Sequence, residues 1–156
     1  VLVIDEIKID YIPVHSRIIR EYLKDGNIKI ANKLLGKEYK IYGHQIKGQG
    51  LGTKSFVPTI NLKIEEFLLP QEGVYVTKTI LDDKEFNSIT FLGHRVTTDG
   101  SYAVETHIIN EDIKNSNYTT QIKFYEKLRD NKKFDSFEEL KKQILNDIET
   151  TRIYFK

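Results

Sequence analysis

The chain has 156 residues, of which 39% are hydrophobic, 30% charged and 11% aromatic, which is typical of a single folded, water-soluble domain. These fractions argue against a collagen, a disordered tail and a membrane protein. With 24 Lys and Arg against 23 Asp and Glu, the formal charge is +1, so we expect no nucleic-acid or membrane partner. The sequence contains no Cys, which excludes disulfides, thiolate zinc sites and cysteine nucleophiles. We expect a cytoplasmic protein. Because its net charge is close to zero, any anion would have to be bound by particular groups at one site and not by the overall charge.

Residues 1–38 are predicted to form a helical segment that differs from the rest of the chain. Ser16 and Asn27 are suitable N-caps for two short helices, which Gly26 and Gly36 would end. Two such helices are too small to bury a core alone. The sequence also lacks Met, so residue 1 is not expected to be a translational start. We therefore interpret residues 1–38 as the end of an upstream domain followed by a helical linker.

From residue 39 onward, short runs of β-branched and aromatic residues alternate with turn residues. Six strands are predicted, at Tyr39–Ile46, Thr59–Ile64, Val74–Leu81, Phe86–Leu92, Ser101–Ile108 and Thr119–Leu128. Hairpin turns are expected at Asp82–Lys84 and at Asp99–Gly100. Six short strands with such connections favour an antiparallel barrel or sandwich, so residues 39–156 are predicted to be one mainly β domain.

A helix is predicted at the C-terminus. Ser136 and Glu139 have the spacing of a capping box. Apolar residues then recur at helical spacing, at Phe137, Leu140, Ile144 and Ile148. We expect this apolar face to cover one side or the mouth of the barrel.

A glycine-rich segment follows the first predicted strand. Gly48, Gly50 and Gly52 would let backbone amides approach a phosphate, and Lys54 would neutralise its charge. The spacing is not that of a P-loop. The alternative is an ordinary turn with no ligand.

Thr59 and Asn61 are two residues apart on a predicted strand, so they project from the same face. A hydroxyl and an amide oxygen suit Mg²⁺, which prefers oxygen donors and keeps waters and phosphates as its other ligands. The alternative is a polar pair that faces solvent.

Glu105 is an acidic residue in the middle of a predicted strand, where acids are depleted. A carboxylate held by a sheet is suited to act as a general base. The alternative for Glu105 is a glutamate on the outer surface with no catalytic role. His107, two residues further on, either supports the site or is exposed to solvent without a role. The four His residues show no metal-ligand spacing.

Taken in order, these segments resemble the riboflavin kinase family, specifically the kinase module of bacterial bifunctional riboflavin kinase/FAD synthetases. The matching stretches are Gly48–Lys54, Pro58–Asn61, Leu69–Tyr75, Val104–Ile108 and Leu128–Leu140. Ser16–Leu23 and Leu34–Tyr39 are similar to the linker that joins the adenylyltransferase domain to the kinase module.

The resemblance implies a six-stranded antiparallel barrel of Greek-key type with a C-terminal helix. It implies transfer of a phosphoryl group from ATP to riboflavin, giving FMN and ADP, with Mg²⁺ as the metal. The implied ATP-binding residues are Gly48, Gly50, Gly52, Lys54, Thr59 and Asn61. Of these, Thr59 and Asn61 would also lie at Mg²⁺, Glu105 would be the catalytic base, and Arg129 and Phe134 would lie near the flavin. The upstream partner would be an adenylyltransferase domain, so this fragment is not expected to make FAD.

The sequence departs from the family pattern at three places. Ser55–Val57 lacks a glycine that is usual before the Thr-containing motif, Ile60 replaces an alanine, and Arg95–Thr98 replaces a proline-containing turn. None of these changes removes a group that the chemistry needs. The alternatives are a flavin- or nucleotide-binding barrel without activity and an oligonucleotide-binding barrel, and the scattered basic residues argue against the latter.

Overall fold

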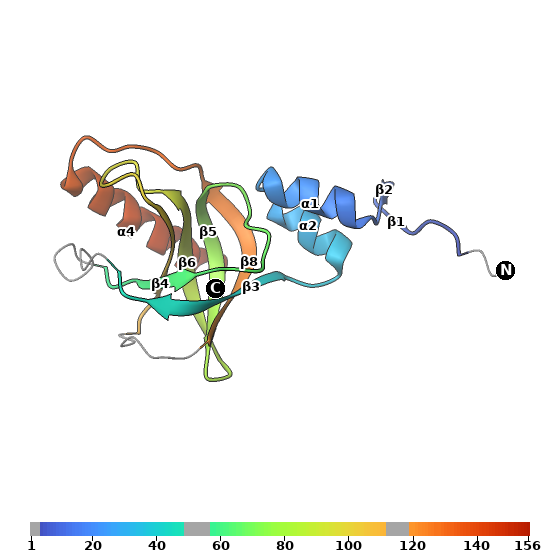
Figure 1. Ribbon diagram of the computed structural model, residues 1–156, viewed down its shortest axis with the longest axis horizontal. Coiled ribbons are helices and arrows are strands. Elements are labelled where there is room, and N and C mark those ends of the chain that lie inside the picture. Colours follow the sequence, from blue (N-terminus) through green and yellow to red (C-terminus); the bar gives the residue numbers. More distant parts are fainter. Residues whose placement is uncertain (1–3, 49–56, 112–118) are drawn as a thin grey trace.

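The computed structural model describes residues 4–48, 57–111 and 119–156. Two short paired strands, β1 (Lys8–Ile9) and β2 (Ile12–Pro13), precede the helices α1 (Ser16–Lys24) and α2 (Ile28–Leu35). The two strands lie beside the start of α1 (Figure 1), and the turn between them contacts α2 through an ion pair of Asp10 with Lys33. No helix within these described ranges is both long and apolar enough to cross a membrane.

The two predicted helices are present, and one of the two predicted N-caps is wrong. Ser16 is the first residue of α1, and the N-cap position belongs to His15, whose side chain makes no capping hydrogen bond. Asn27 does cap α2, because its side chain accepts a hydrogen bond from the backbone N–H of Ile30 at 3.4 Å. Gly36 ends α2 in a left-handed conformation with φ 69°, which glycine adopts without steric cost.

A closed antiparallel barrel follows the helices, so the predicted fold class is confirmed. Its strands are β3 (Tyr39–Ile46), β4 (Ile60–Lys63), β5 (Gly73–Leu81), β6 (Lys84–His94), β7 (Tyr102–Ile108) and β8 (Thr119–Arg129). Around the barrel the order is β3-β4-β7-β6-β5-β8. Closure leaves no unpaired edge strand in the sheet.

The two predicted hairpin turns have different outcomes. Leu81 pairs with Lys84, which leaves Asp82 and Asp83 as a two-residue turn with positive φ at both positions. Asp99–Gly100 is not a tight hairpin turn. It lies in a longer connection, because the last residue of β6 and the first residue of β7 are paired directly across the ladder.

The barrel interior combines apolar side chains with hydroxyl groups. Alternation along the strands directs the following buried residues inward: Ile41, Tyr75, Leu92, Val104, Ile122, Phe124, Thr77, Thr79, Ser88, Thr90 and Thr106. The hydroxyls satisfy one another, as in the 2.8 Å bond between Thr77 and Thr90 and the 3.0 Å bond from Thr90 to Thr106. Leu23 and Ile28 join the same core, so α1 and α2 cover one end of the barrel.

The helix α4 (Phe137–Tyr154) crosses the outer face of the barrel (Figure 1). Ser136 caps it by accepting a hydrogen bond from the backbone N–H of Glu139 at 3.2 Å. Ile148 is buried against Ile89 of β6. The apolar face of α4 therefore covers one side of the barrel. A cavity remains between the helix and the sheet.

Candidate functional site

A cavity of about 500 Å³ lies where the outer face of the barrel meets α4 and the loops around it. Its wall is contributed by Gly48 after β3, the approach to β4, outward residues of β5, β6 and β7, the β6–β7 loop and the end of β8. Apolar side chains of α4, including Leu140 and Ile144, complete the wall. This volume is in the range of small-molecule sites, roughly 300–1,000 Å³.

Glu105 lies on the cavity side of β7. Its neighbours Val104 and Thr106 point into the barrel, so Glu105 points outward, beneath the cavity. Its side chain is 25% exposed. Asn61 of β4 is paired directly with Glu105 in the β4–β7 ladder. The two side chains therefore stand next to each other on the same face of the sheet.

A guanidinium group joins these two residues. Arg95, in the β6–β7 loop, donates from Nε and Nη2 to Glu105 Oε1 at 2.9 and 2.5 Å. The same Nη2 donates to Asn61 Oδ1 at 2.8 Å, and Nη1 donates to Ser101 Oγ at 2.7 Å. The positive charge of Arg95 balances the carboxylate of Glu105 in a site where both side chains are mostly buried.

The structure describes only some of the other residues that were predicted to bind the nucleotide. Thr59 lies just before β4, half-buried, and lines the cavity together with Asn61 and Gly48. A Cβ at Gly48 would lie 3.0 Å from Asn61 Cγ, so a larger residue there would have to displace the Asn61 side chain. Gly50, Gly52 and Lys54 lie outside the described residues.

His107 is the next outward residue of β7 after Glu105, and it contacts the segment that carries Thr59. Its ring Nδ1 donates to the carbonyl oxygen of Pro58 at 2.8 Å, because a carbonyl only accepts. Burial lowers the pKa of His107, which favours the neutral ring. Of the two interpretations of His107, this contact favours support of the site.

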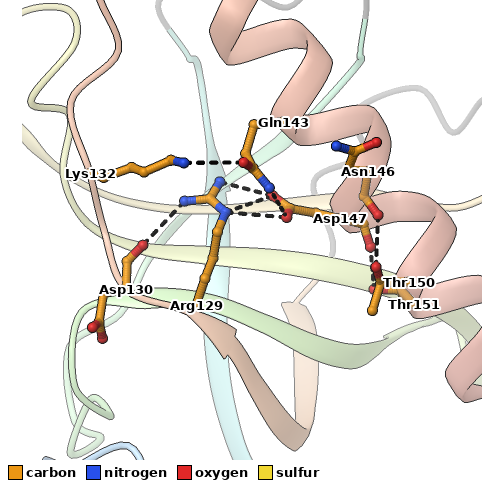
Figure 2. A network of polar contacts seen from close by, with 8 residues as sticks. All are labelled: Arg129, Asp130, Lys132, Gln143, Asn146, Asp147, Thr150 and Thr151. Atoms are coloured by element: carbon orange, nitrogen blue, oxygen red, sulfur yellow. Dashed lines mark hydrogen bonds and ion pairs between the residues drawn. The ribbon is translucent and has the colours of Figure 1, made fainter.

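Arg129 and Phe134 lie on the opposite wall, near α4. Figure 2 shows the Arg129 guanidinium directed at Asp147 of α4, to which Nε and Nη2 donate at 3.0 and 2.8 Å. Gln143 donates to the same carboxylate at 2.9 Å. The ring of Phe134 lines the cavity, with Lys132 Nζ 4.9 Å and the Arg129 guanidinium carbon 5.8 Å from its centroid. Arg129 therefore anchors α4 to the end of β8, and Phe134 contributes its aromatic ring to the cavity wall.

A profile of the family described as "Flavokinase: Riboflavin kinase" matches residues 35–155, which is most of the chain and the whole barrel with α4. The chain belongs to the riboflavin kinase family.

Individual relatives agree with this membership. The chain is 35% identical over 144 residues to the bifunctional riboflavin kinase/FMN adenylyltransferase of Haemophilus influenzae, which covers 91% of this chain and 47% of that protein. It is 30% identical to the enzyme of the same name from Escherichia coli K12, with 91% of this chain and 46% of that protein covered. The chain thus spans about half the length of the curated relatives it matches.

A solved structure from Streptococcus pneumoniae, described as a macrolide-efflux protein, has a TM-score of 0.86 and 30% identity to this chain. The match covers 94% of this chain and 49% of that one. The description as an efflux protein applies to the S. pneumoniae protein. For this chain the similarity supports the fold.

The cavity also has donors that suit a hard cation. In the part of the chain that the structure describes, no group of three or more His, Asp or Glu side chains could hold a metal ion. The cavity does present the Thr59 hydroxyl, the Asn61 amide oxygen and the Glu105 carboxylate. These oxygen donors fit Mg²⁺, which takes few protein ligands when phosphates and waters supply the rest.

Sequence reasoning missed two residues that organise the candidate site. Arg95 was considered only as part of an altered turn, although it contacts both Asn61 and Glu105. Asp147, one of the least exposed charged side chains, was not singled out on its helix. One signal was available in the sequence: Asp147 lies three residues after Ile144 and seven after Leu140, which is the spacing of the apolar face, so it is expected on the buried side of α4. Nothing local indicated the partner of either residue.

Proposed function

We propose that the chain is a riboflavin kinase module that transfers the γ-phosphoryl group of ATP to the ribityl 5′-hydroxyl of riboflavin, giving FMN and ADP. Family membership supports the reaction class. The observation that carries the proposal is the pairing of Glu105 with Asn61 beneath a cavity of suitable size. This pairing puts Glu105, a potential proton acceptor, beside Asn61, a potential ligand of the metal and of the nucleotide phosphates.

Glu105 is proposed to act as the general base. Its carboxylate would accept the proton of the ribityl hydroxyl while that oxygen forms a bond to the γ-phosphorus and ADP leaves. The sheet holds the backbone of Glu105, and both Arg95 hydrogen bonds go to Oε1. Oε2 is then the oxygen best suited to receive the proton.

Thr59 and Asn61 are proposed to face the nucleotide phosphates and Mg²⁺. When bound there, Mg²⁺ would offset the charge on the phosphate oxygens. Gly50, Gly52 and Lys54 are proposed to bind the same phosphates, on the chemistry of a glycine-rich segment with a cation alone. Phosphoryl transfer needs such positioning and charge stabilisation more than covalent chemistry.

The flavin is proposed to lie between the barrel wall and α4. Phe91 of β6 and Phe134 line the cavity, and a flat aromatic ring needs apolar surfaces with few polar contacts. Arg129 would support this wall through Asp147. The adenylyltransferase activity named in the relatives would belong to sequence beyond the matched half, so this chain is proposed to make FMN and no FAD.

Incubation of the chain with riboflavin, ATP and Mg²⁺, followed by chromatography, tests the reaction. FMN formation supports the proposal, whereas flavin binding without FMN would favour the non-catalytic barrel.

Glu105→Gln tests the base. We expect turnover to fall by about 10²- to 10⁴-fold, the usual contribution of a positioned acid or base, with riboflavin affinity retained. Glu111→Gln is the matched control, because Glu111 is a second carboxylate that lines the cavity without an assigned role. Equal losses in the two variants would remove Glu105 from the mechanism.

A further inference from the structure

Arg95 places a fixed positive charge between the Asn61 amide and the Glu105 carboxylate, the two groups that the proposed chemistry uses. Its Nη2 lies 2.8 Å from Asn61 Oδ1 and 2.5 Å from Glu105 Oε1. The Arg95 side chain is only 17% exposed, so solvent screens its charge weakly and the charge acts on the groups of the site. A guanidinium stays protonated under all ordinary conditions.

A divalent cation at Asn61 Oδ1 would have to share that oxygen with the guanidinium. Amide oxygens have two lone pairs, so sharing is possible in terms of geometry. Two positive charges within a few ångströms of each other repel strongly at a partly buried site. Arg95 and a bound cation therefore compete for Asn61.

The opposite side of the guanidinium is tied to its own loop. Nη1 donates to Ser101 Oγ, and the backbone N–H of Arg95 donates to the Ser101 carbonyl at 2.9 Å. Ser101 is itself fixed, since its hydroxyl donates to Asp99 at 2.8 Å. Arg95 can lose its contact with Asn61 and still be held by Ser101 and Glu105.

We propose that Arg95 occupies the place of the cation in the ligand-free site, where it holds Asn61 and Glu105 in position, and that binding of the metal–nucleotide displaces it from Asn61 alone. This inference rests on the proposed function. It makes Arg95 a positioning residue that lowers the affinity of the empty site for a divalent cation and orients the base for turnover.

The proposal predicts two effects of opposite sense when Arg95 is removed. Arg95→Gln frees Asn61 and leaves the Glu105 carboxylate without its counter-charge, so divalent cations bind more tightly. The same change frees the Glu105 side chain to rotate, so turnover falls. A purely structural role would weaken both properties.

The test uses Mn²⁺ as a paramagnetic probe, added to the whole chain without nucleotide or riboflavin, with free Mn²⁺ measured by electron paramagnetic resonance. We expect Arg95→Gln to lower the Mn²⁺ dissociation constant by about tenfold or more, as removal of a like charge at close range implies. FMN turnover of the same variant should fall by about tenfold or more, because a misplaced catalytic group is costly. Arg95→Lys keeps the charge and should restore a Mn²⁺ affinity close to that of the unchanged protein.

Arg20→Gln is the matched control, since Arg20 is an exposed arginine on α1 that contacts Ser16 and should leave both readouts unchanged. Ser101→Ala removes the Nη1 contact together with the bond from the Ser101 hydroxyl to Asp99, and it leaves the Arg95 contacts with Glu105 in place. It should produce smaller shifts in the same two directions, and it decides the question if Arg95→Gln does not fold. Mn²⁺ affinity that is unchanged or weaker in the deciding variant, including no detectable binding, would overturn the proposal. A chain that binds Mn²⁺ as expected but forms no FMN would instead refute the proposed function.

Discussion

Asp147 is expected to be one of the most important polar residues for the stability of the α4 layer. Its side chain is 6% exposed, and it accepts hydrogen bonds from Arg129 and Gln143. Asp147→Ala would leave the Arg129 guanidinium, which is 19% exposed, without a counter-charge. Breaking a buried pair in this way costs about 3–5 kcal/mol of the free energy of unfolding.

For a chain of this size, 1 kcal/mol corresponds to about 2–4 °C in melting temperature, so Asp147→Ala should lower it by roughly 6–20 °C. Thermal unfolding followed by circular dichroism measures this shift. The control is Glu149→Ala on the same helix, which breaks an exposed pair with Arg152 and should cost less than about 1 kcal/mol. The double variant Arg129→Met, Asp147→Leu removes both charges and should recover much of the loss. Equal melting temperatures for the Asp147 and Glu149 variants would refute the reasoning.

Two further predictions concern pH and backbone strain. Because burial lowers the pKa of His107 below its unfolded value of about 6.5, its neutral form stabilises the fold above that pH, and stability should fall as the pH drops below it. Urea unfolding at a series of pH values should show a shallower decline in His107→Gln, and an identical decline would contradict the assignment. Gly73→Ala should cost about 3 kcal/mol or more, because φ is 154° and the new Cβ would lie 2.5 Å from the Arg129 carbonyl oxygen. Gly36→Ala, with φ 69° and nothing within 4 Å, should cost about 1–2 kcal/mol, and equal urea midpoints for the two variants would contradict the clash.

Features that depend on local chemistry followed from the sequence alone. Period-two alternation in β7 correctly put Glu105 and His107 on the face opposite Val104. The capping box at Ser136 correctly marked the start of α4. The turn at Asp82 and Asp83 joins the strands that were predicted to flank it. Each of these features is decided by residues within a few positions of one another.

The contacts that make the site depend on residues far apart in the chain. The pairing of Asn61 with Glu105, the reach of Arg95 to Asn61 and the bridge from Arg129 to Asp147 all depend on how the strands and α4 assemble. No local preference specifies them, because strand register and helix placement are set by the total burial of the barrel core and the outer face. The amino-acid sequence therefore determined which chemical groups are available and which way each strand face points, and only the closed barrel with its covering helix decided which of those groups meet.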